Sequence, residues 1–88
     1  MSYEIKPTKK FMKHYKNLHQ NERKQIKKTT ELLVQNPYHP SLRAKEIKGA
    51  NGLFECGANM DIRIIWHYEG DKLIILLDVG HHDILKKF

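Results

Sequence analysis

Apolar residues near the start of the chain recur at the spacing of an α-helix. Phe11, Tyr15 and Leu18 follow one another at intervals of four and three residues, so they would share one helical face. Thr8, directly after Pro7, is a suitable N-cap because its hydroxyl can accept a backbone hydrogen bond. Lysines occupy another face. The pattern predicts an amphipathic helix after Thr8 with a basic outer side.

A second amphipathic segment is NERKQIKKTTELLVQ, residues 21–35, in which Asn21 would be the N-cap. Ile26 and Leu33 would face inward, and the arginine and lysines between them would face solvent. The polar residues 17–20 predict a break between the two helices. Two amphipathic helices joined by a short polar connection favour an antiparallel helical hairpin.

The hydrophobic period changes after residues 36–43, which contain two prolines and predict a loop. AKEIKG then reads as a short strand or an irregular link. Strand patterns occupy LFECGA, DIRIIWHY and KLIILLDV, at residues 53–58, 61–68 and 72–79. The predicted fold class is α+β: a helical hairpin on a three- or four-stranded antiparallel sheet, whether or not SYEIK, residues 2–6, forms a short first strand.

The last two strands predict a register. EGDK would be a tight hairpin turn in which Glu69 pairs with Lys72. Four apolar pairs would then face the helices: Tyr68–Leu73, Trp66–Ile75, Ile64–Leu77 and Ile62–Val79. The opposite face would carry Arg63 opposite Asp78. It would also expose three aliphatic side chains that a partner segment or the C-terminal tail would cover: Ile65, Ile74 and Leu76.

Two adjacent histidines follow the last strand. Continued past Gly80, the predicted register puts His82 on the open face beside Asp61 and Arg63, and points His81 toward the core. Arg63, Asp61 and His82 would therefore share one surface. An ordinary surface ion pair at Arg63 and histidines without a role would account for the same residues.

These residue types suit cleavage of RNA without a metal ion. The 2′-hydroxyl attacks the adjacent phosphate when a base removes its proton, an acid protonates the leaving 5′-oxygen, and a cation stabilises the added charge. Histidine titrates near neutrality, and arginine can donate two parallel hydrogen bonds to a phosphate. His82, or His81 if the strand twists, forms a minimal set with Arg63 and Asp61. Because His81, His82 and Asp83 are consecutive, they cannot all point at one ion from a strand, so we expect no metal and no cofactor.

Size and charge agree with such a function. The 88 residues predict a single domain, residues 1–88, with a formal net charge of +6. This excess favours a polyanionic partner, and Lys45, Lys48, Lys86 and Lys87 could hold an RNA backbone. The single cysteine, Cys56, excludes an internal disulfide and fits a reducing compartment. No segment has the length of a signal peptide core or a membrane span, so we expect a cytoplasmic protein without membrane contact.

Two basic amphipathic helices followed by GLFECGANMDIRIIWHYEGDKLIILLDVGHHDIL resemble toxins of the RelE/ParE superfamily from bacterial toxin–antitoxin systems. The VGHH end and the strand with arginine, two isoleucines and an aromatic residue are the most specific features. The resemblance implies a helical hairpin on an antiparallel sheet. In RelE-like members it implies a metal-independent endoribonuclease that cuts mRNA, often on the ribosome. It also implies an antitoxin protein that neutralises the toxin.

The resemblance assigns roles to particular residues. Arg63 matches the phosphate-contacting arginine of the central strand, and Asp61 matches an acidic residue of the histidine-bearing members. His81 and His82 fall where the superfamily has its C-terminal histidine or arginine, and alignment does not say which of the two is equivalent. Further catalytic or RNA-binding side chains of some members fall near Lys45, Glu46 and Lys48.

Three functions remain in order of preference. The first is an mRNA-cleaving toxin. The second is a toxin of the ParE-like branch, which poisons DNA gyrase and has no nuclease chemistry. The third is an inactive relative that only binds nucleic acid or an antitoxin.

Overall fold

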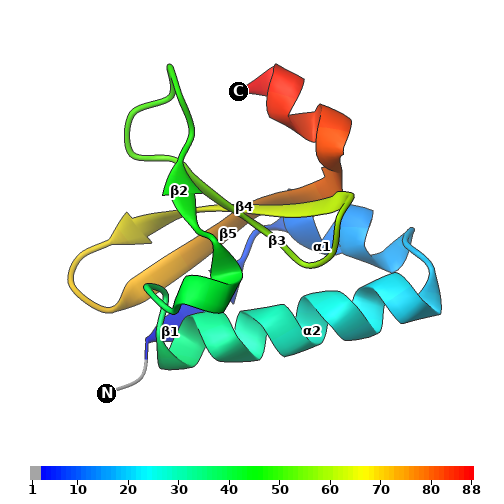
Figure 1. Ribbon diagram of the computed structural model, residues 1–88, viewed down its shortest axis with the longest axis horizontal. Helices are drawn as coiled ribbons and strands as arrows, with labels where there is room; N and C mark the ends of the chain where they lie inside the picture. The colour runs from blue at the N-terminus through cyan, green and yellow to red at the C-terminus, as the bar shows by residue number, and fades with distance from the viewer. Residues whose placement is uncertain (1–2) are drawn as a thin grey trace.

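The computed structural model describes residues 3–88 and has two α-helices, five strands and two short 3-10 helices (Figure 1). In chain order these are β1 Glu4–Pro7, α1 Lys9–Lys16, α2 Gln20–Gln35, η1 Pro40–Leu42, β2 Lys45–Glu46, β3 Phe54–Gly57, β4 Ile62–Glu69, β5 Leu73–His81 and η2 His82–Lys87. Helix α2 lies along one face of the sheet, whereas the β2–β3 loop and η2 rise from the other face (Figure 1). The predicted α+β class is confirmed.

The sheet has the strand order β1-β5-β4-β3-β2. Four strands are antiparallel, as predicted, but β1 pairs in parallel with β5, so the sheet is mixed and has one strand more than predicted. The predicted first strand began at Ser2, which lies outside the described residues. Within residues 3–88, no helix combines the length and apolar character needed to cross a membrane.

Helix α1 forms as its pattern predicts. The Thr8 hydroxyl oxygen accepts from the Phe11 N–H at 3.1 Å, which confirms the N-cap. The same hydroxyl donates to the Leu77 carbonyl at 3.1 Å and so ties the helix to β5. Phe11 is buried, and Tyr15 and Leu18 pack against the core. The sequence pattern alone therefore identified the inner face of this helix.

Helix α2 begins two residues earlier than the predicted N-cap implies. Its N-cap is His19 rather than Asn21. The Glu22 carboxylate accepts a hydrogen bond from the His19 N–H at 3.0 Å and so forms a capping box over the first turn. Ile26 and Leu33 are buried as predicted. The helical hairpin is thus confirmed, with its connection shortened to residues 17–19.

The predicted register of the β4–β5 hairpin is wrong. The turn contains three residues, 70–72, so Glu69 pairs with Leu73, and Gly70 has a positive φ of 68°, which glycine adopts without strain. A β-bulge between Ile65 and Trp66 shifts the register again. The observed apolar neighbours are Tyr68–Ile74, Trp66–Leu76 and Ile64–Val79, and Ile62 lies opposite His81.

This register changes which side chains are covered. Ile74 and Leu76 belong to the main core between sheet and helices, not to the open face. Ile65 belongs to a second apolar cluster, where it is fully buried with Ile47 from the β2–β3 loop and Ile84 from η2. The predicted exposed aliphatic surface is therefore absent from the described residues, and for Ile65 the C-terminal tail supplies the cover.

The predicted pairing of Arg63 with Asp78 is also wrong, because the bulge puts Gly80 opposite Arg63. Asp78 is fully buried and interacts with α1 instead. Its Oδ1 lies 2.6 Å from His14 Nδ1, and its Oδ2 lies 3.5 Å from Lys10 Nζ. These contacts join α1 to the last strand.

Candidate active site

A cleft of about 800 Å³ lies between the η1–β2 segment, strand β3 and the start of η2. His82, Arg63 and Lys45 all line it, so the structure brings together three of the residues that the sequence singled out. Arg43 lines the same cleft and was not predicted. One acidic side chain, Glu55, faces this basic group. The cleft therefore combines an imidazole with three cations.

Arg63 is held in this cleft by the backbone before β4 and by Glu55. Its Nη1 donates to the Asn59 carbonyl at 3.0 Å and to the Ile62 carbonyl at 3.3 Å, and its Nε lies 3.8 Å from Glu55 Oε1. Glu55 is only 8% exposed. Gly57 lies opposite Arg63 on β3, and a β-carbon there would come within 2.6 Å of Nη1. The guanidinium therefore occupies space that only a glycine leaves open.

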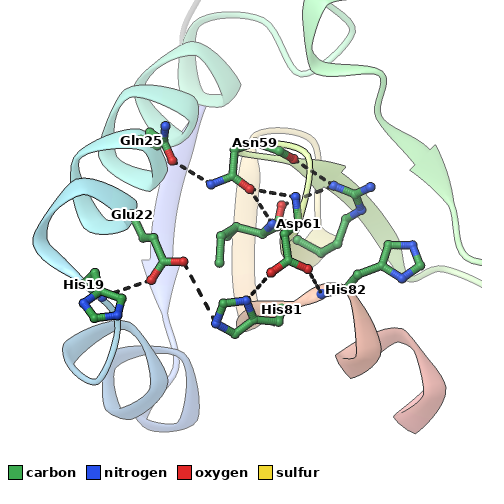
Figure 2. Close-up of polar contacts among 9 residues, drawn as sticks. His19, Glu22, Gln25, Asn59, Asp61, His81 and His82 are labelled. Atoms are coloured by element: carbon green, nitrogen blue, oxygen red, sulfur yellow. Dashed lines mark hydrogen bonds and ion pairs between the residues drawn. The ribbon is translucent and has the colours of Figure 1, made fainter.

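Asn59 organises the turn that leads into β4. Its Oδ1 accepts from the N–H groups of Asp61 and Ile62 at 2.8 and 2.7 Å, and its Nδ2 donates to Gln25 Oε1 on α2 at 2.6 Å (Figure 2). Asn59 was not among the residues predicted to build the site. Its position just before a strand is the sequence feature from which this role could have been inferred, because asparagine side chains commonly accept hydrogen bonds from backbone N–H groups two or three residues ahead.

Asp61 joins both histidines. Its Oδ1 accepts from the His82 backbone N–H at 3.2 Å, and its Oδ2 is hydrogen-bonded to His81 Nδ1. Figure 2 shows the His81 ring between Asp61 and Glu22, with Nε2 4.0 Å from Glu22 Oε2, and the His82 ring pointing the other way. His81 lies on the helix side as predicted, but its side chain is half-exposed rather than sealed in the core. Only His82 lines the cleft.

The electrostatics of this pair favour two charged partners. The hydrogen bond from His81 lowers the pKa of Asp61, and the His82 N–H adds to this effect. The same hydrogen bond with Asp61 raises the pKa of His81, and the Glu22 charge acts in the same direction. Both shifts favour the charged form of each partner, with the His81 ring between the Asp61 and Glu22 carboxylates. This arrangement fixes the strand end from which His82 projects.

The remaining predicted residues lie outside the cleft lining. Lys48 is exposed on the β2–β3 loop, and Lys86 and Lys87 are exposed on η2. Cys56, in the cleft wall, is a buried free thiol whose burial raises its pKa to about 12. Its thiolate is therefore negligible at neutral pH. Within residues 3–88, no group of three His, Cys, Asp or Glu side chains is arranged to hold a metal ion.

Several solved structures share this fold. A chain of the RelB–RelE antitoxin–toxin complex from Methanococcus jannaschii superposes with a TM-score of 0.73 and is 28% identical, with 92% of this chain and 94% of that chain covered. A chain of the E. coli DinJ–YafQ toxin–antitoxin complex gives a TM-score of 0.77 at 19% identity, with coverage of 97% and 98%. YafQ from E. coli strain BL21(DE3) also gives 0.77 at 19% identity, with coverage of 94% and 97%.

A search of curated proteins by sequence finds no match. A sequence model of one protein family does match, over residues 3–87, and its description is "Bacterial toxin of type II toxin-antitoxin system, YafQ". The match covers nearly the whole chain, and the fold agrees with it. The chain therefore belongs to the YafQ family of bacterial toxins of type II toxin–antitoxin systems.

Proposed function

We propose that this toxin is a metal-independent endoribonuclease that cleaves mRNA, on the ribosome, and thereby stops translation and growth. The supporting observation is that His82, Arg63 and Lys45 line one cleft. A proton-transfer group next to two cations is what attack of a 2′-hydroxyl on its neighbouring phosphate requires. The resemblance to RelE-like toxins points to the same reaction.

Arg63 binds the scissile phosphate. The Asn59 carbonyl and the Glu55 carboxylate hold the guanidinium from one side and fix its orientation before substrate arrives. Lys45 comes from β2, where it lies next to Glu55 in the sheet, and adds positive charge to the same cleft. Charges fixed in advance stabilise the pentavalent phosphorane without reorganisation during the reaction.

His82 transfers the proton. Its ring projects into the cleft while its backbone N–H is held by Asp61, so the imidazole can bind and release a proton near the phosphate. Asp61 and His81 act on the reaction through His82: they are positioning residues that hold the end of β5 against the turn before β4. Lys48, Lys86 and Lys87 supply a more distant electrostatic attraction for the RNA backbone.

We also propose that a cognate antitoxin protein neutralises the toxin in the cytoplasm. The similar structures from M. jannaschii and E. coli are toxin–antitoxin complexes. The net charge of +6 on this chain suits an acidic protein partner.

The test is cleavage of mRNA after induced expression, and by the purified protein added to ribosomes that carry a defined mRNA, with 5′ ends mapped by primer extension. Wild type should cut transcripts and stop growth, whereas the Arg63→Ala/His82→Ala double variant should do neither. His67→Gln, on β4 and outside the cleft lining, is the matched control and should keep cleavage. Equal cleavage by wild type and the double variant would exclude this site, and intact mRNA with trapped gyrase would support the ParE-like function instead.

A further inference from the structure

A second groove, of about 360 Å³, adjoins the cleft across the Arg43–Lys45 segment. We call it the Tyr38 groove. Its walls are Tyr38, Phe54 and Tyr68 together with the loop before β2. Arg43 and Lys45 line both the groove and the cleft. An extended ligand that leaves the cleft over these two side chains would enter the Tyr38 groove directly.

Tyr38 is held in an exposed position. The residue is 74% exposed, which is high for a large aromatic residue. The loop that carries it is stiff: the Tyr38 N–H donates to Asn36 Oδ1 at 3.0 Å, the His39 N–H donates to the Asn36 carbonyl at 3.0 Å, and Pro37 is buried. Because this backbone is already restrained, the loop loses little conformational freedom when the Tyr38 ring binds a flat partner.

Arg43 is held in an unusual conformation. It has a φ of 50°, the left-handed region, and is the one non-glycine residue with positive φ among residues 3–88. Such conformations are unfavourable for a long side chain and concentrate at ligand-binding positions. Here the left-handed residue ends η1 and sends the chain into β2, so that the Arg43 side chain lies between the groove and the cleft.

The charge of the groove favours an anionic occupant. Arg43 and Lys45 are its cationic residues, and Glu46 is its one acidic residue. The Glu46 carboxylate already accepts from the Gly52 N–H at 2.7 Å within the β2–β3 loop. An aromatic face beside two cations is the combination that binds single-stranded nucleic acid, because bases stack on the ring while cations hold the phosphates.

We propose that the Tyr38 groove is a subsite for a nucleotide that flanks the scissile phosphate, with its base stacked on Tyr38 and its phosphate bound by Arg43. This inference rests on the proposed ribonuclease function. A protein segment could also bury an exposed tyrosine, but the sharing of Arg43 and Lys45 with the phosphate-binding cleft favours RNA. The subsite would make cleavage depend on the nucleotide at one flanking position.

The binding test uses the His82→Ala protein, so that the probe stays intact. The probe is a set of short single-stranded RNAs, each carrying the fluorescent base 2-aminopurine at a different position. Stacking on Tyr38 should quench one position. Tyr38→Ala should abolish that quenching and weaken binding about 5- to 150-fold, the range of base–aromatic stacking. Tyr38→Phe keeps the ring and should behave like the parent.

The cleavage test uses the protein with His82 intact. Tyr38→Ala should raise KM far more than it lowers kcat, and should relax the nucleotide preference on one side of the cut. Unchanged quenching, affinity and KM in folded Tyr38→Ala would overturn the subsite while cleavage by wild type stands. Failure of wild type to cleave mRNA on the ribosome would overturn the ribonuclease proposal separately. Unchanged RNA binding with loss of a co-expressed antitoxin from Tyr38→Ala would identify the groove as a protein-binding surface and overturn the inference.

Discussion

Replacing Gly57 with alanine tests whether Arg63 must lie where the structure holds it. The new β-carbon would come within 2.6 Å of Arg63 Nη1 and 3.0 Å of the Asn59 carbonyl oxygen, whereas ordinary van der Waals contact begins at 3.4 Å. Because the guanidinium is the flexible end of its side chain, it is the group that moves, by about 0.8 Å (3.4 minus 2.6 Å). The 3.0 Å hydrogen bond from Nη1 to the Asn59 carbonyl would then lengthen to about 3.4 Å and weaken.

The expected effect on cleavage is large and the effect on folding is small. A misplacement of roughly 1 Å in a positioned catalytic group lowers the rate about 100-fold, so we expect kcat/KM to fall by about this factor. The weakened hydrogen bond destabilises the protein by at most about 0.5–1.5 kcal/mol, which is the contribution of an intact one. Replacing glycine offsets about 0.4–1 kcal/mol of this, because it restricts the unfolded chain. Cleavage kinetics on a defined RNA and urea unfolding measure the two quantities.

Two further variants make the result specific to Arg63. Adding Gly57→Ala to Arg63→Ala should lower cleavage no further, because the group that the alanine displaces is already gone. Gly49→Ala, at a φ of +83° with no atom within 4 Å of the new β-carbon, should lose stability but keep cleavage. A Gly57→Ala protein that cleaves RNA as fast as wild type would refute the argument that the position of Arg63 matters.

Three other outcomes follow from contacts away from the guanidinium. His14→Ala should lower the free energy of unfolding by about 1–3 kcal/mol in urea titrations, because it removes a hydrogen bond to the buried Asp78 carboxylate, and His14→Gln should retain part of it. Protonated His81 stabilises the fold fully below its unfolded pKa of about 6.5, and this stabilisation is lost as the pH rises through its raised folded pKa. Ionised Asp61 stabilises the fold fully above its unfolded pKa of about 3.9, and this stabilisation is lost as the pH falls through its lowered folded pKa. The thermal midpoint of His81→Gln should therefore fall furthest below wild type between about pH 4 and 6.5, and a constant difference up to pH 9 would contradict this linkage. The Cys56 thiol, buried and with its pKa raised to about 12, should react with a disulfide reagent at pH 8 only at the rate of unfolding.

The helices could be predicted from the sequence because each has one apolar face and an otherwise charged surface. Phe11, Ile26 and Leu33 are buried as their spacing indicates. The first strand of the hairpin was equally clear, since Ile62 and Trp66 are the inward positions of an alternating pattern. In these elements the sequence pattern leaves one arrangement that buries the apolar side chains.

The register of β5 could not be predicted in the same way. Residues 73–77 are all aliphatic, so a slip by one residue still leaves apolar side chains on both faces. Alternation therefore did not distinguish a two-residue turn from the observed three-residue turn, and it gave no sign of the bulge at Ile65. The role of Arg43 could not be predicted either, because its place in the cleft depends on how the proline-containing loop folds back on the sheet.

The β-bulge that made the register prediction wrong also positions residues of the candidate site. It puts Gly80 of β5 opposite Arg63, which pairs on its other side with Gly57 of β3. Gly57 leaves room for the guanidinium, because a β-carbon at this position would lie only 2.6 Å from Arg63 Nη1. Gly80 leaves room for Ile84 of η2, whose Cγ2 would lie 2.7 Å from a β-carbon on Gly80. Because Ile84 can pack this close to the strand, η2 folds over the sheet immediately after β5, and His82 at its first position enters the cleft that contains Arg63.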